Sequence, residues 1–527
     1  MQMNLLIIIG AIILILSIII GFFRLYHPFK TLNKANYNED EYDIIIVGAG
    51  LAGLTAAYEA NKLTNNSARI LLLEASDSYG GNSINDIDGI NILLNEKNDN
   101  ANNIRDSFSL FFNDSNEYGQ YTSDTELLTI LVNKSHELLD FFIKDLGCNN
   151  LRIIKSEGSS FSRTFISNFS NITTGKYLST SLYNRLKNIS STKILFNSIF
   201  TDLIINSEHT VVHGIKYNIS TNNITNANTS TIETKSIYSK SVILCTGGYG
   251  SDFYTNESIL NESLVQLYYF PTFTTKYTRG DGLKIARNKG GALTHQRFGD
   301  IYPTCFVHLK DRFNRHKILC PDKFRELGAI LMNKRGKRFC DERGTRRYVG
   351  QNILKNCDIV TDPKIIKQYE GFLIINEAIK KQYGNDINTF IDKGFFIKYK
   401  SFDDFAKDMN ISNYIENIRK SIRSYNQISE TKSDEYNKNN FQNKFKMKST
   451  IYVAIITPCT FHTFGGVQIT DECEILNTKD RIIYGLYAAG EVIGGIHGSL
   501  AMQGNILTQA AVFGREAAKA AVKYIKE

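Results

Sequence analysis

The sequence lacks any cysteine pattern that would hold a metal ion or a haem. Its 527 residues include 8 cysteines, scattered without a Cys-x-x-Cys pair or a haem-attachment motif. Iron–sulfur clusters need several thiolate ligands close together, and no such set is present. We therefore expect no metal site and mostly reduced thiols, several of them buried, although a disulfide between distant cysteines stays open.

A concentrated block of positive charge is also missing. The formal net charge is +8, but the lysines are dispersed among asparagine and isoleucine. Such diffuse charge can attract anionic substrates or a membrane surface, and solvated lysine-rich faces explain it equally well. No nucleic-acid-binding motif occurs, so we expect no nucleic-acid partner. The length and the 42% hydrophobic content suffice for a large core in two domains.

The N-terminal region contains one long uncharged and largely apolar run, at residues 5–23. About 19 residues suffice to cross a hydrocarbon core of about 30 Å as a helix. The run is long for a signal peptide, and no small-x-small cleavage site follows closely. Arg24, Lys30 and Lys34 follow it, which favours a cytosolic position for the catalytic part. We predict a single-pass membrane anchor with its tether at residues 1–40; a cleaved signal or an organelle presequence is the alternative.

The most informative stretch is a strand–turn–helix pattern at residues 42–60. An apolar strand runs into Gly-Ala-Gly-Leu-Ala-Gly, and a helical segment follows. Gly48 permits the tight turn, Gly50 lets the backbone approach a pyrophosphate, and Gly53 lets the helix pack closely on the sheet. The N-terminus of that helix favours a phosphate group. This pattern predicts dinucleotide binding rather than a glycine-rich core turn.

An acid and four short motifs of small residues follow in an informative order. Glu74 ends a second apolar strand about 20 positions after Gly53, the spacing of an acid that holds ribose hydroxyls. Each later motif alone is more typical of a turn, but four in this order behind a dinucleotide fold favour FAD over NAD. The predicted FAD-binding residues are Gly48, Gly50, Leu51, Ala52, Gly53, Glu74, Ala75, Gly81, Asn82, Ser83, Thr246, Gly247, Gly248, Asp281, Gly490 and Glu491.

Six segments carry a resemblance to a known family: IIIVGAGLAGLTAAYEA, LLLEASDSYGGNS, ILCTGGYG, TRGDGLKIA, ITPCTFHTFGGVQI and YAAGEVIGGIHG. Together they resemble the soluble fumarate reductases, FAD proteins related to the flavoprotein subunits of succinate dehydrogenase. The resemblance covers about residues 43–525. It implies an α/β fold, with a Rossmann-like FAD-binding domain of the glutathione-reductase type and an inserted α+β capping domain.

This resemblance divides the chain into four parts. We expect the anchor and tether at residues 1–40, the first part of the FAD-binding domain at 41–283, the capping domain at 284–449, and the second part of the FAD-binding domain at 450–527. Covalently linked relatives carry a histidine shortly after the Gly-Gly-Asn-Ser motif. None follows it closely here, so we expect non-covalent FAD.

The resemblance also implies catalytic residues. In the family, the flavin passes a hydride to one alkene carbon and an arginine protonates the other. The segment GKRFCDERGTRR places Arg346 at that position, and PDKFR places Asp322 and Arg325 where they would supply the proton. An arginine acts as an acid only when a cationic or apolar setting lowers its pKa, and Arg343 and Arg347 lie nearby in the sequence. The alternative is a charged loop with surface salt bridges.

Three positions depart from the substrate pocket of the family. Tyr302 and Phe461 stand where histidines are expected, with His462 one position after Phe461, and Ala501 replaces an arginine that clamps a substrate carboxylate. Bidentate arginine is the usual way to hold a carboxylate, and a buried carboxylate without partners costs several kcal/mol. The predicted pocket, with Thr304 as its fifth member, is therefore more apolar and less cationic.

Three functions stay open at this point. The first is a reductase of activated C=C bonds with fumarate as the default acceptor, because the proposed proton-delivery residues are present. The second is the same chemistry on a bulkier, less charged acceptor, and the third is a flavin-binding protein without turnover. Since the sequence has no second Gly-x-Gly-x-x-Gly for a nicotinamide, electrons would come from reduced flavin or a separate reductase.

Overall fold

The computed structural model describes residues 41–94, 106–169, 172–222, 230–253, 256–361, 366–431, 433–439, 441 and 443–527. The predicted anchor at residues 5–23 and its tether lie outside the described residues. Within the described ranges, no helix combines the length and the apolar character needed to cross a bilayer.

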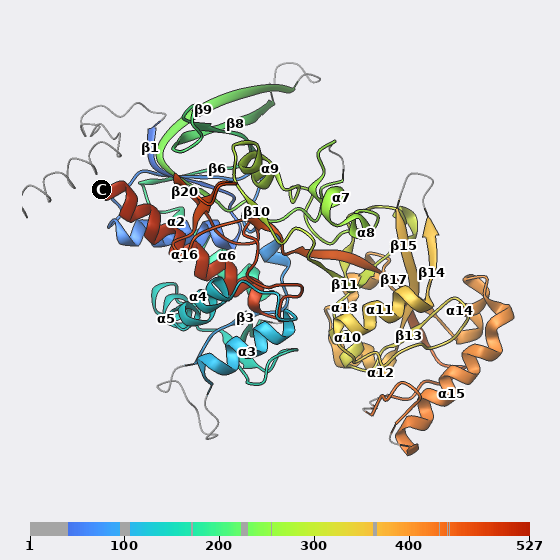
Figure 1. The fold of residues 1–527 in the computed structure, drawn as a ribbon. Helices are drawn as coiled ribbons and strands as arrows, with labels where there is room; N and C mark the ends of the chain where they lie inside the picture. The colour runs from blue at the N-terminus through green and yellow to red at the C-terminus, as the bar shows by residue number, and fades with distance from the viewer. Residues whose placement is uncertain are drawn as a thin grey trace, which may run out of the picture. The chain divides into compact units, whose positions relative to one another are not determined.

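The first part of the molecule is built on an eight-stranded sheet (Figure 1). Its strands are β1 (Glu41–Val47), β2 (Ile70–Leu73), β6 (Thr192–Leu195), β7 (Ser198–Ile205), β8 (Val212–Asn222), β9 (Ser230–Leu244), β19 (Glu474–Leu476) and β20 (Ile482–Ala488). The order is β19-β20-β9-β1-β2-β6, and β8 pairs with both β7 and β9. β1, β2 and β6 run parallel, and β20 runs parallel to β9. The apolar run predicted as a strand is the fully buried centre of β1, as expected where both faces of a parallel sheet are covered.

Helices of this part pack on the sheet or on one another. They include α2 (Leu51–Leu63), α3 (Phe108–Tyr118), α4 (Thr125–Ser135), α5 (Glu137–Asp140), the π-helical turn η3 (Phe141–Asp145), α6 (Thr174–Leu186), α9 (Asp281–Asn288) and α16 (Asn505–Lys526). The alanine-rich C-terminal helix α16 lies along α2 (Figure 1). A Cβ at Gly514 would meet the Ala52 carbonyl oxygen at 2.6 Å, so the two helix backbones are in close contact there. Two small sheets, β3 (Ile90–Asn91) with β5 (Thr164–Ser167) and β4 (Leu151–Ile154), and β10 (Leu293–Thr294) with β18 (Gly466–Val467), complete this part.

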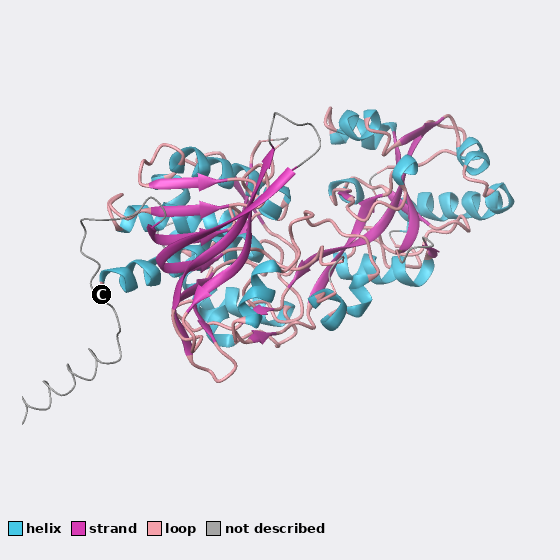
Figure 2. Ribbon diagram, turned by 90° about the horizontal axis from the view of Figure 1, so that it is seen from above, coloured by secondary structure: helices cyan, strands magenta, loops and turns pink. Residues whose placement is uncertain are grey.

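The second part is built on a seven-stranded antiparallel sheet, which Figure 2 shows as a separate group of strands. Its strands are β11 (Gly299–Phe306), β12 (Ile318–Leu319), β13 (Ile330–Met332), β14 (Asp358–Thr361), β15 (Lys367–Asn376), β16 (Ile397–Tyr399) and β17 (Ile451–Thr463). Around them lie α10 (Lys323–Glu326), α11 (Arg346–Asn356), α12 (Glu377–Tyr383), α13 (Ile387–Asp392), α14 (Phe402–Asp408) and α15 (Ile415–Thr431). This part has its own apolar core, rich in phenylalanine and isoleucine. The short α7 (Ile259–Ser263) and α8 (Val265–Tyr268) bury their apolar side chains in the core of the first part.

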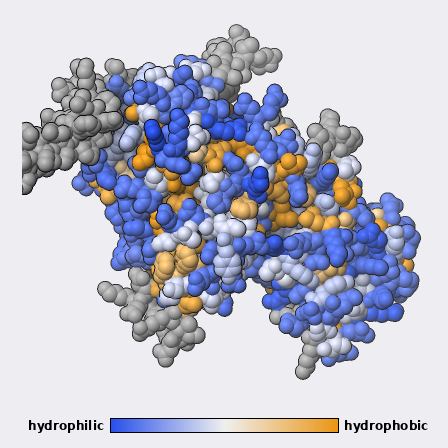
Figure 3. Space-filling view, viewed as in Figure 1, coloured by the Kyte–Doolittle hydropathy of each residue, from blue (hydrophilic) through white to orange (hydrophobic). Residues whose placement is uncertain are grey.

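β17 connects the two parts. All 13 of its residues are buried, and it pairs with β11, β15 and β16 of the second sheet. The predicted boundary at residue 450 falls at the start of this strand, so the chain returns to the eight-stranded part only after Thr463. The four-part division itself stays a prediction. On the face shown in Figure 3 the surface is mostly hydrophilic, and apolar surface gathers toward the middle of the view.

β7 and β8 form a hairpin, in which Ser198 pairs with Ile219 and Ile205 pairs with Val212. Helical structure continues from α4 (Thr125–Ser135) through the short α5 to the π-helical turn that ends at Asp145, in agreement with the helical periodicity of residues 126–146. The expectation for the cysteines is confirmed, since all 8 are free and buried.

Candidate active site

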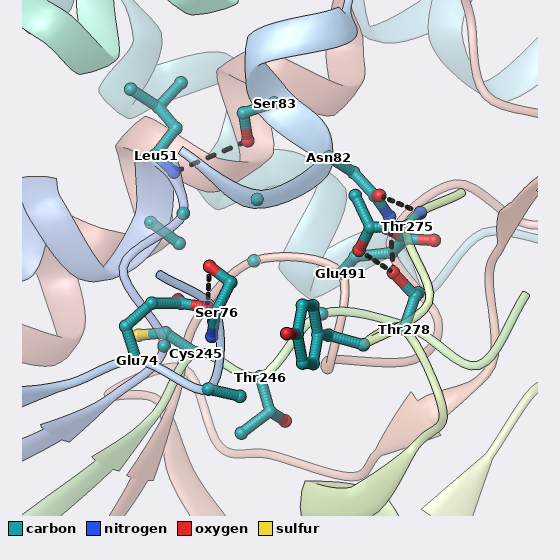
Figure 4. A pocket seen from close by; sticks show the side chains of 18 of the residues that line it. Leu51, Glu74, Ser76, Asn82, Ser83, Cys245, Thr246, Thr275, Thr278 and Glu491 are labelled. Carbon is teal, nitrogen blue, oxygen red and sulfur yellow. Dashed lines mark hydrogen bonds between the residues drawn. The ribbon is translucent and has the colours of Figure 1, made fainter. Parts of the chain in front are cut away.

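A cavity of about 380 Å³ lies where β1, β2 and β9 end, at the N-terminus of α2 (Figure 4). This is the edge at which parallel sheets bind nucleotides. Most of the predicted FAD-binding residues line it: Gly48, Gly50, Leu51, Ala52, Glu74, Ala75, Gly81, Asn82, Ser83, Thr246, Gly247, Asp281, Gly490 and Glu491. Gly53 and Gly248 do not line it.

The three glycines of the first turn have different environments. Gly48 has φ +108°, and a Cβ there would lie 2.3 Å from the Cys245 carbonyl oxygen. A Cβ at Gly53 would lie 1.8 Å from the Gly48 carbonyl oxygen, so Gly53 permits close packing rather than ligand contact. A Cβ at Gly50 would meet no protein atom closer than 4.0 Å. Gly50 therefore leaves space that belongs to the cavity.

The N-terminus of α2 has unused hydrogen-bonding capacity. Gly50 occupies the cap position, with no side-chain cap. Ser83 Oγ accepts a bond of 3.4 Å from Leu51 N, as Figure 4 shows, which is a long and weak contact. An uncapped helix start beside a glycine that leaves open space fits a pyrophosphate group.

The Glu74 carboxylate is held firmly at the side of the cavity. Its Oε2 accepts from Ala49 N at 2.8 Å, and its Oε1 accepts from the backbone N and the Oγ of Ser76, both at 2.8 Å. These bonds join the end of β2 to the glycine turn after β1. Glu74 is thus positioned as an acceptor for hydroxyl groups, the role that the sequence predicts for it.

The segment before α9 contributes residues that the sequence analysis missed. Thr275, Lys276, Tyr277 and Thr278 line the cavity. Asn82 Nδ2 donates to Thr278 Oγ1 at 3.0 Å, and Asn82 Oδ1 accepts from Thr275 N at 2.9 Å (Figure 4). Asp281, a predicted FAD-binding residue, lies three positions after Thr278 and was the signal available for this segment.

Glu491 bonds within the protein. Its Oε1 accepts from Thr463 N at 3.0 Å and from Thr463 Oγ1 at 3.3 Å. A Cβ at Gly248 would come within 2.6 Å of the same oxygen, so Gly248 makes room for this carboxylate. The bonds fix the end of β17 against the cavity.

His462 lies between the cavity at the start of α2 and a second, smaller cavity, and it lines both. Its side chain is 8% exposed, and among the described residues neither ring nitrogen has a hydrogen-bond partner. Nδ1 is 3.7 Å from Glu491 Oε1, too far for a direct bond. Burial opposes the charged ring, but Glu491 and the nearby Asp86 outweigh it, so the pKa of His462 is raised. The ring is a buried polar group without a partner from the protein.

The second cavity is nearly closed. Its volume of about 20 Å³ has room for about one water molecule. It is lined by Asp88, Tyr118, Glu157, Asp300, Arg346, Phe461, His462, Ala501, Met502, Gln503 and Ile506. An organic acceptor would therefore need this region to open.

Arg346 is the cation of this second cavity. It begins α11, and Thr345 Oγ1 caps the helix by accepting from Tyr348 N at 3.2 Å. Its Nη1 and Nη2 donate to the two oxygens of Asp88 at 2.7 and 2.5 Å, and its Nε donates to Asp322 at 2.7 Å. Its side chain is 11% exposed. The alternative of a loop with surface salt bridges therefore does not describe this residue.

The predicted proton-delivery residues are adjacent, but the acidity of Arg346 differs from expectation. Asp322 pairs with both Arg325 and Arg346. Burial opposes the charge of Arg346, yet Asp88 and then Asp322 outweigh it, so the pKa of Arg346 is raised well above its ordinary value. The pKa of Asp322 is lowered, because Arg346 and Arg325 overcome the effect of burial. The expected lowering of the Arg346 pKa by neighbouring arginines is thus wrong.

The predicted substrate residues divide into two groups. Phe461, His462 and Ala501 line the second cavity. Tyr302 and Thr304 line neither cavity; both are fully buried, and the hydroxyl of each donates to the Cys320 carbonyl oxygen. The guanidinium of Arg346 lies 4.7 Å from the centre of the Tyr302 ring, within cation–π range. Tyr302 therefore contacts Arg346 without lining either cavity.

The second cavity has few cations, as the sequence predicts, but it is acidic as well, which the sequence did not indicate. Asp88, Glu157 and Asp300 line it, and these residues come from segments far apart in the sequence. No local motif links them, so only the folded chain brings them together. Asp86 lines the first cavity next to them.

Comparisons with known proteins show the family of the chain. A family model described as "FAD binding domain" matches residues 43–507. A fumarate reductase of Schizosaccharomyces pombe is 28% identical over 94% of this chain and 92% of that protein, and fumarate reductase 1 of Saccharomyces cerevisiae is 28% identical over 90% and 97%. A solved flavocytochrome c3 fumarate reductase in an open conformation superposes with a TM-score of 0.75 at 25% identity, over 93% of this chain and 79% of that one. The predicted resemblance to fumarate reductases is confirmed.

Proposed function

Because the chain belongs to the FAD binding domain family, we propose that it is an FAD-dependent oxidoreductase that reduces an activated C=C bond. The observation that carries the proposal is the contact between the two cavities at His462. An acceptor beside Arg346 would lie next to the group held in the larger cavity. The fumarate reductases among the relatives support this reaction class.

The residues of the larger cavity fit FAD. The uncapped start of α2 and the space left by Gly50 suit the pyrophosphate, and Glu74 suits the ribose. When bound and reduced by an electron donor, FAD would supply a hydride to one alkene carbon while the other carbon gains a proton. We expect this binding to be non-covalent.

The protein would contribute the orientation of the acceptor and a store of protons. Asp88 and Asp322 fix the guanidinium of Arg346, so its position beside the second cavity is defined. The contiguous Arg325, Asp322 and Arg346 form a chain along which a proton can move. Since the pKa of Arg346 is raised in this closed arrangement, proton donation would require the pairing with Asp88 to weaken as the cavity opens.

A second candidate function is flavin binding without turnover. The nearly closed second cavity and the tightly paired Arg346 favour it over a fully assembled fumarate site. Either function draws electrons, if at all, from reduced flavin or a separate reductase. The predicted anchor at residues 5–23 would place the protein at a membrane, with the catalytic part on the cytosolic side.

The test begins with the chain lacking its first 30 or so residues. Purified protein without yellow flavin would contradict both candidates. With flavin bound, reduced viologen is supplied as electron donor and its oxidation is followed with fumarate and then with a panel of enoates and enones. Oxidation that depends on an acceptor, and that Arg346→Ala abolishes, supports the reductase. No oxidation with any acceptor supports binding without turnover.

A further inference from the structure

We propose that the acceptor carries a cationic group, such as an ammonium, guanidinium or imidazolium, in place of the second carboxylate of fumarate. This inference rests on the proposed function, because it names the substrate class of the same site. It comes from the charges that surround the second cavity and from the partners that these charges have.

Carboxylates outnumber cations at this cavity. Asp88, Glu157 and Asp300 line it, whereas among the described residues that line it Arg346 is the only arginine or lysine. The charge of Arg346 is already shared between Asp88 and Asp322. Asp322 has a second partner in Arg325, which offsets one more negative charge. The remaining carboxylates thus have no arginine or lysine of their own at the cavity.

Neutral hydrogen-bond donors stabilise some of these carboxylates. Glu157 Oε1 accepts from the Tyr118 hydroxyl at 2.7 Å and its Oε2 accepts from Arg346 N at 3.3 Å, and Gln503 Nε2 donates to Asp88 at 3.2 Å. Asp300 has the poorest support. In the part of the chain that the structure describes, its one hydrogen bond is from Ile301 N, at 2.8 Å. Its other oxygen is therefore available to a ligand.

Two further residues of the cavity also lack a free positive charge for a second carboxylate. Ala501 stands where the family resemblance expects an arginine, and it lines the cavity beside the carboxylates. His462 has two ring nitrogens without a partner and a side chain that is 8% exposed, and it faces the same space. Its charge when protonated is offset by Glu491. Neither residue supplies a free positive charge for a second carboxylate.

The energetic consequence is direct. A dicarboxylate would bring two negative charges into a buried space that already holds uncompensated ones, and like charges at short range repel strongly where water is excluded. A ligand with one carboxylate or carbonyl and one cation could instead pair its cation with Asp300 or Glu157. Arg346 would remain for the single carboxylate or carbonyl that activates the alkene.

Three acceptors on one four-carbon enoate scaffold test this inference. They are fumarate, crotonate and 4-aminocrotonate, which differ in a carboxylate, a methyl or an aminomethyl group at one end. With FAD-loaded protein and reduced viologen, we expect kcat/KM for 4-aminocrotonate to exceed that for fumarate by at least about tenfold. A fumarate value equal to or higher than that for 4-aminocrotonate would overturn the inference.

A binding measurement makes the test independent of turnover. The saturated compounds succinate, butyrate and 4-aminobutyrate are titrated into the oxidised, FAD-loaded protein, and the Kd is read from the change in flavin absorbance or by calorimetry. The tightest Kd is expected for 4-aminobutyrate. If none of the enoates is reduced but this order holds, the proposed reductase function fails, whereas the preference of the site for a cationic ligand stands. Tightest binding of succinate, or no binding of any of the three, contradicts the class.

One variant and its control test whether Asp300 binds the cationic group of the ligand. Asp300→Asn removes the charge and retains the shape, and it should weaken binding of 4-aminobutyrate by about tenfold while butyrate binding stays within about twofold. Asp392→Asn is the matched control, because Asp392 is exposed and lines neither cavity. Equal effects of the two variants would show that the charge of Asp300 has no part in recognition.

Discussion

Arg346 and Asp88 are joined by two parallel N–H···O bonds, of 2.7 and 2.5 Å, between residues 258 positions apart in the sequence. The arginine begins α11 on the second sheet, and the aspartate follows the glycine-rich turn after β2. Both side chains are largely buried. This ion pair ties the two parts of the molecule together next to the candidate active site.

Removal of Arg346 should therefore destabilise the protein as well as affect its chemistry. Arg346→Ala leaves Asp88 and Asp322 buried with one partner fewer, and we expect the free energy of unfolding to fall by about 3–5 kcal/mol. Chemical denaturation followed by circular dichroism measures the loss. Arg343→Ala, an exposed arginine nearby, should change stability by less than about 0.5 kcal/mol. Similar small changes in both variants would show that the pair contributes no stability.

Two glycines of the first turn should respond differently to alanine. In Gly50→Ala the new methyl group meets no protein atom within 4.0 Å, so flavin-free stability should hardly change, while FAD affinity should fall by about tenfold or more. In Gly53→Ala the methyl group would lie 1.8 Å from the Gly48 carbonyl oxygen, so the protein should lose stability whether or not FAD is present. FAD titration and thermal melting of both variants check this. Unchanged FAD affinity in Gly50→Ala would exclude Gly50 from the cofactor site.

Asp86 should make stability depend on pH. Burial and then the neighbouring Asp88 raise the pKa of Asp86 to about 7, above the value of about 3.9 for an unfolded chain. Its stabilising protonated form is fully present below about pH 4, and the contribution is lost as the pH rises to about 7. Relative to Asp86→Asn, the flavin-free protein should thus lose a few kcal/mol between these pH values. A difference between the two proteins that stays constant with pH would contradict the raised pKa.

An arginine at position 501 should restore acceptance of a dicarboxylate. Ala501 lines the acidic cavity, so Ala501→Arg would place a new cation beside Asp300 and Glu157. We expect the ratio of kcat/KM for fumarate to that for 4-aminocrotonate to rise by at least about tenfold. Ala501→Met adds comparable bulk without charge and is the control. The same rise with methionine would assign the effect to shape.

The predicted anchor can be tested in cells. The full chain should sediment with membranes and resist extraction with high salt or carbonate, and a chain lacking residues 1–30 should not, since the run at residues 5–23 supplies the apolar length. Protease protection of intact vesicles reports the side on which the C-terminal part lies. A full chain that remains in the supernatant would contradict the anchor.

The cofactor half of the site could be predicted because its determinants are local. Gly48, Gly50 and Glu74 lie within about one strand–helix–strand unit, where backbone sterics and helix geometry prescribe the residue types. The fold class was implied by the family resemblance, which includes this pattern. Thr275 and Thr278 were missed because they have ordinary loop composition and only their bonds to Asn82 bring them to the cavity.

The charge of the second cavity could not be predicted for a different reason. Asp88, Glu157 and Asp300 belong to three separate segments, and none shows a motif. The substitutions of Tyr302, Phe461 and Ala501 indicated a loss of positive charge but not a gain of negative charge. The sign of the pKa change at Arg346 likewise depends on Asp88, which no spacing in the sequence associates with it.

The parallel pairing of β20 with β9 has a consequence for synthesis of the protein. The edge of β9 at Val242–Leu244 is covered only when Leu486–Ala488 have been made, after the whole second sheet. The last helix, α16, completes the cover of α2. During translation, β9 and the apolar face of α2 thus remain uncovered until more than two hundred further residues have been synthesised. The nascent chain should need a chaperone until its C-terminus is released, and a nonsense mutation before residue 482 should leave an aggregating fragment rather than a smaller flavin-binding protein.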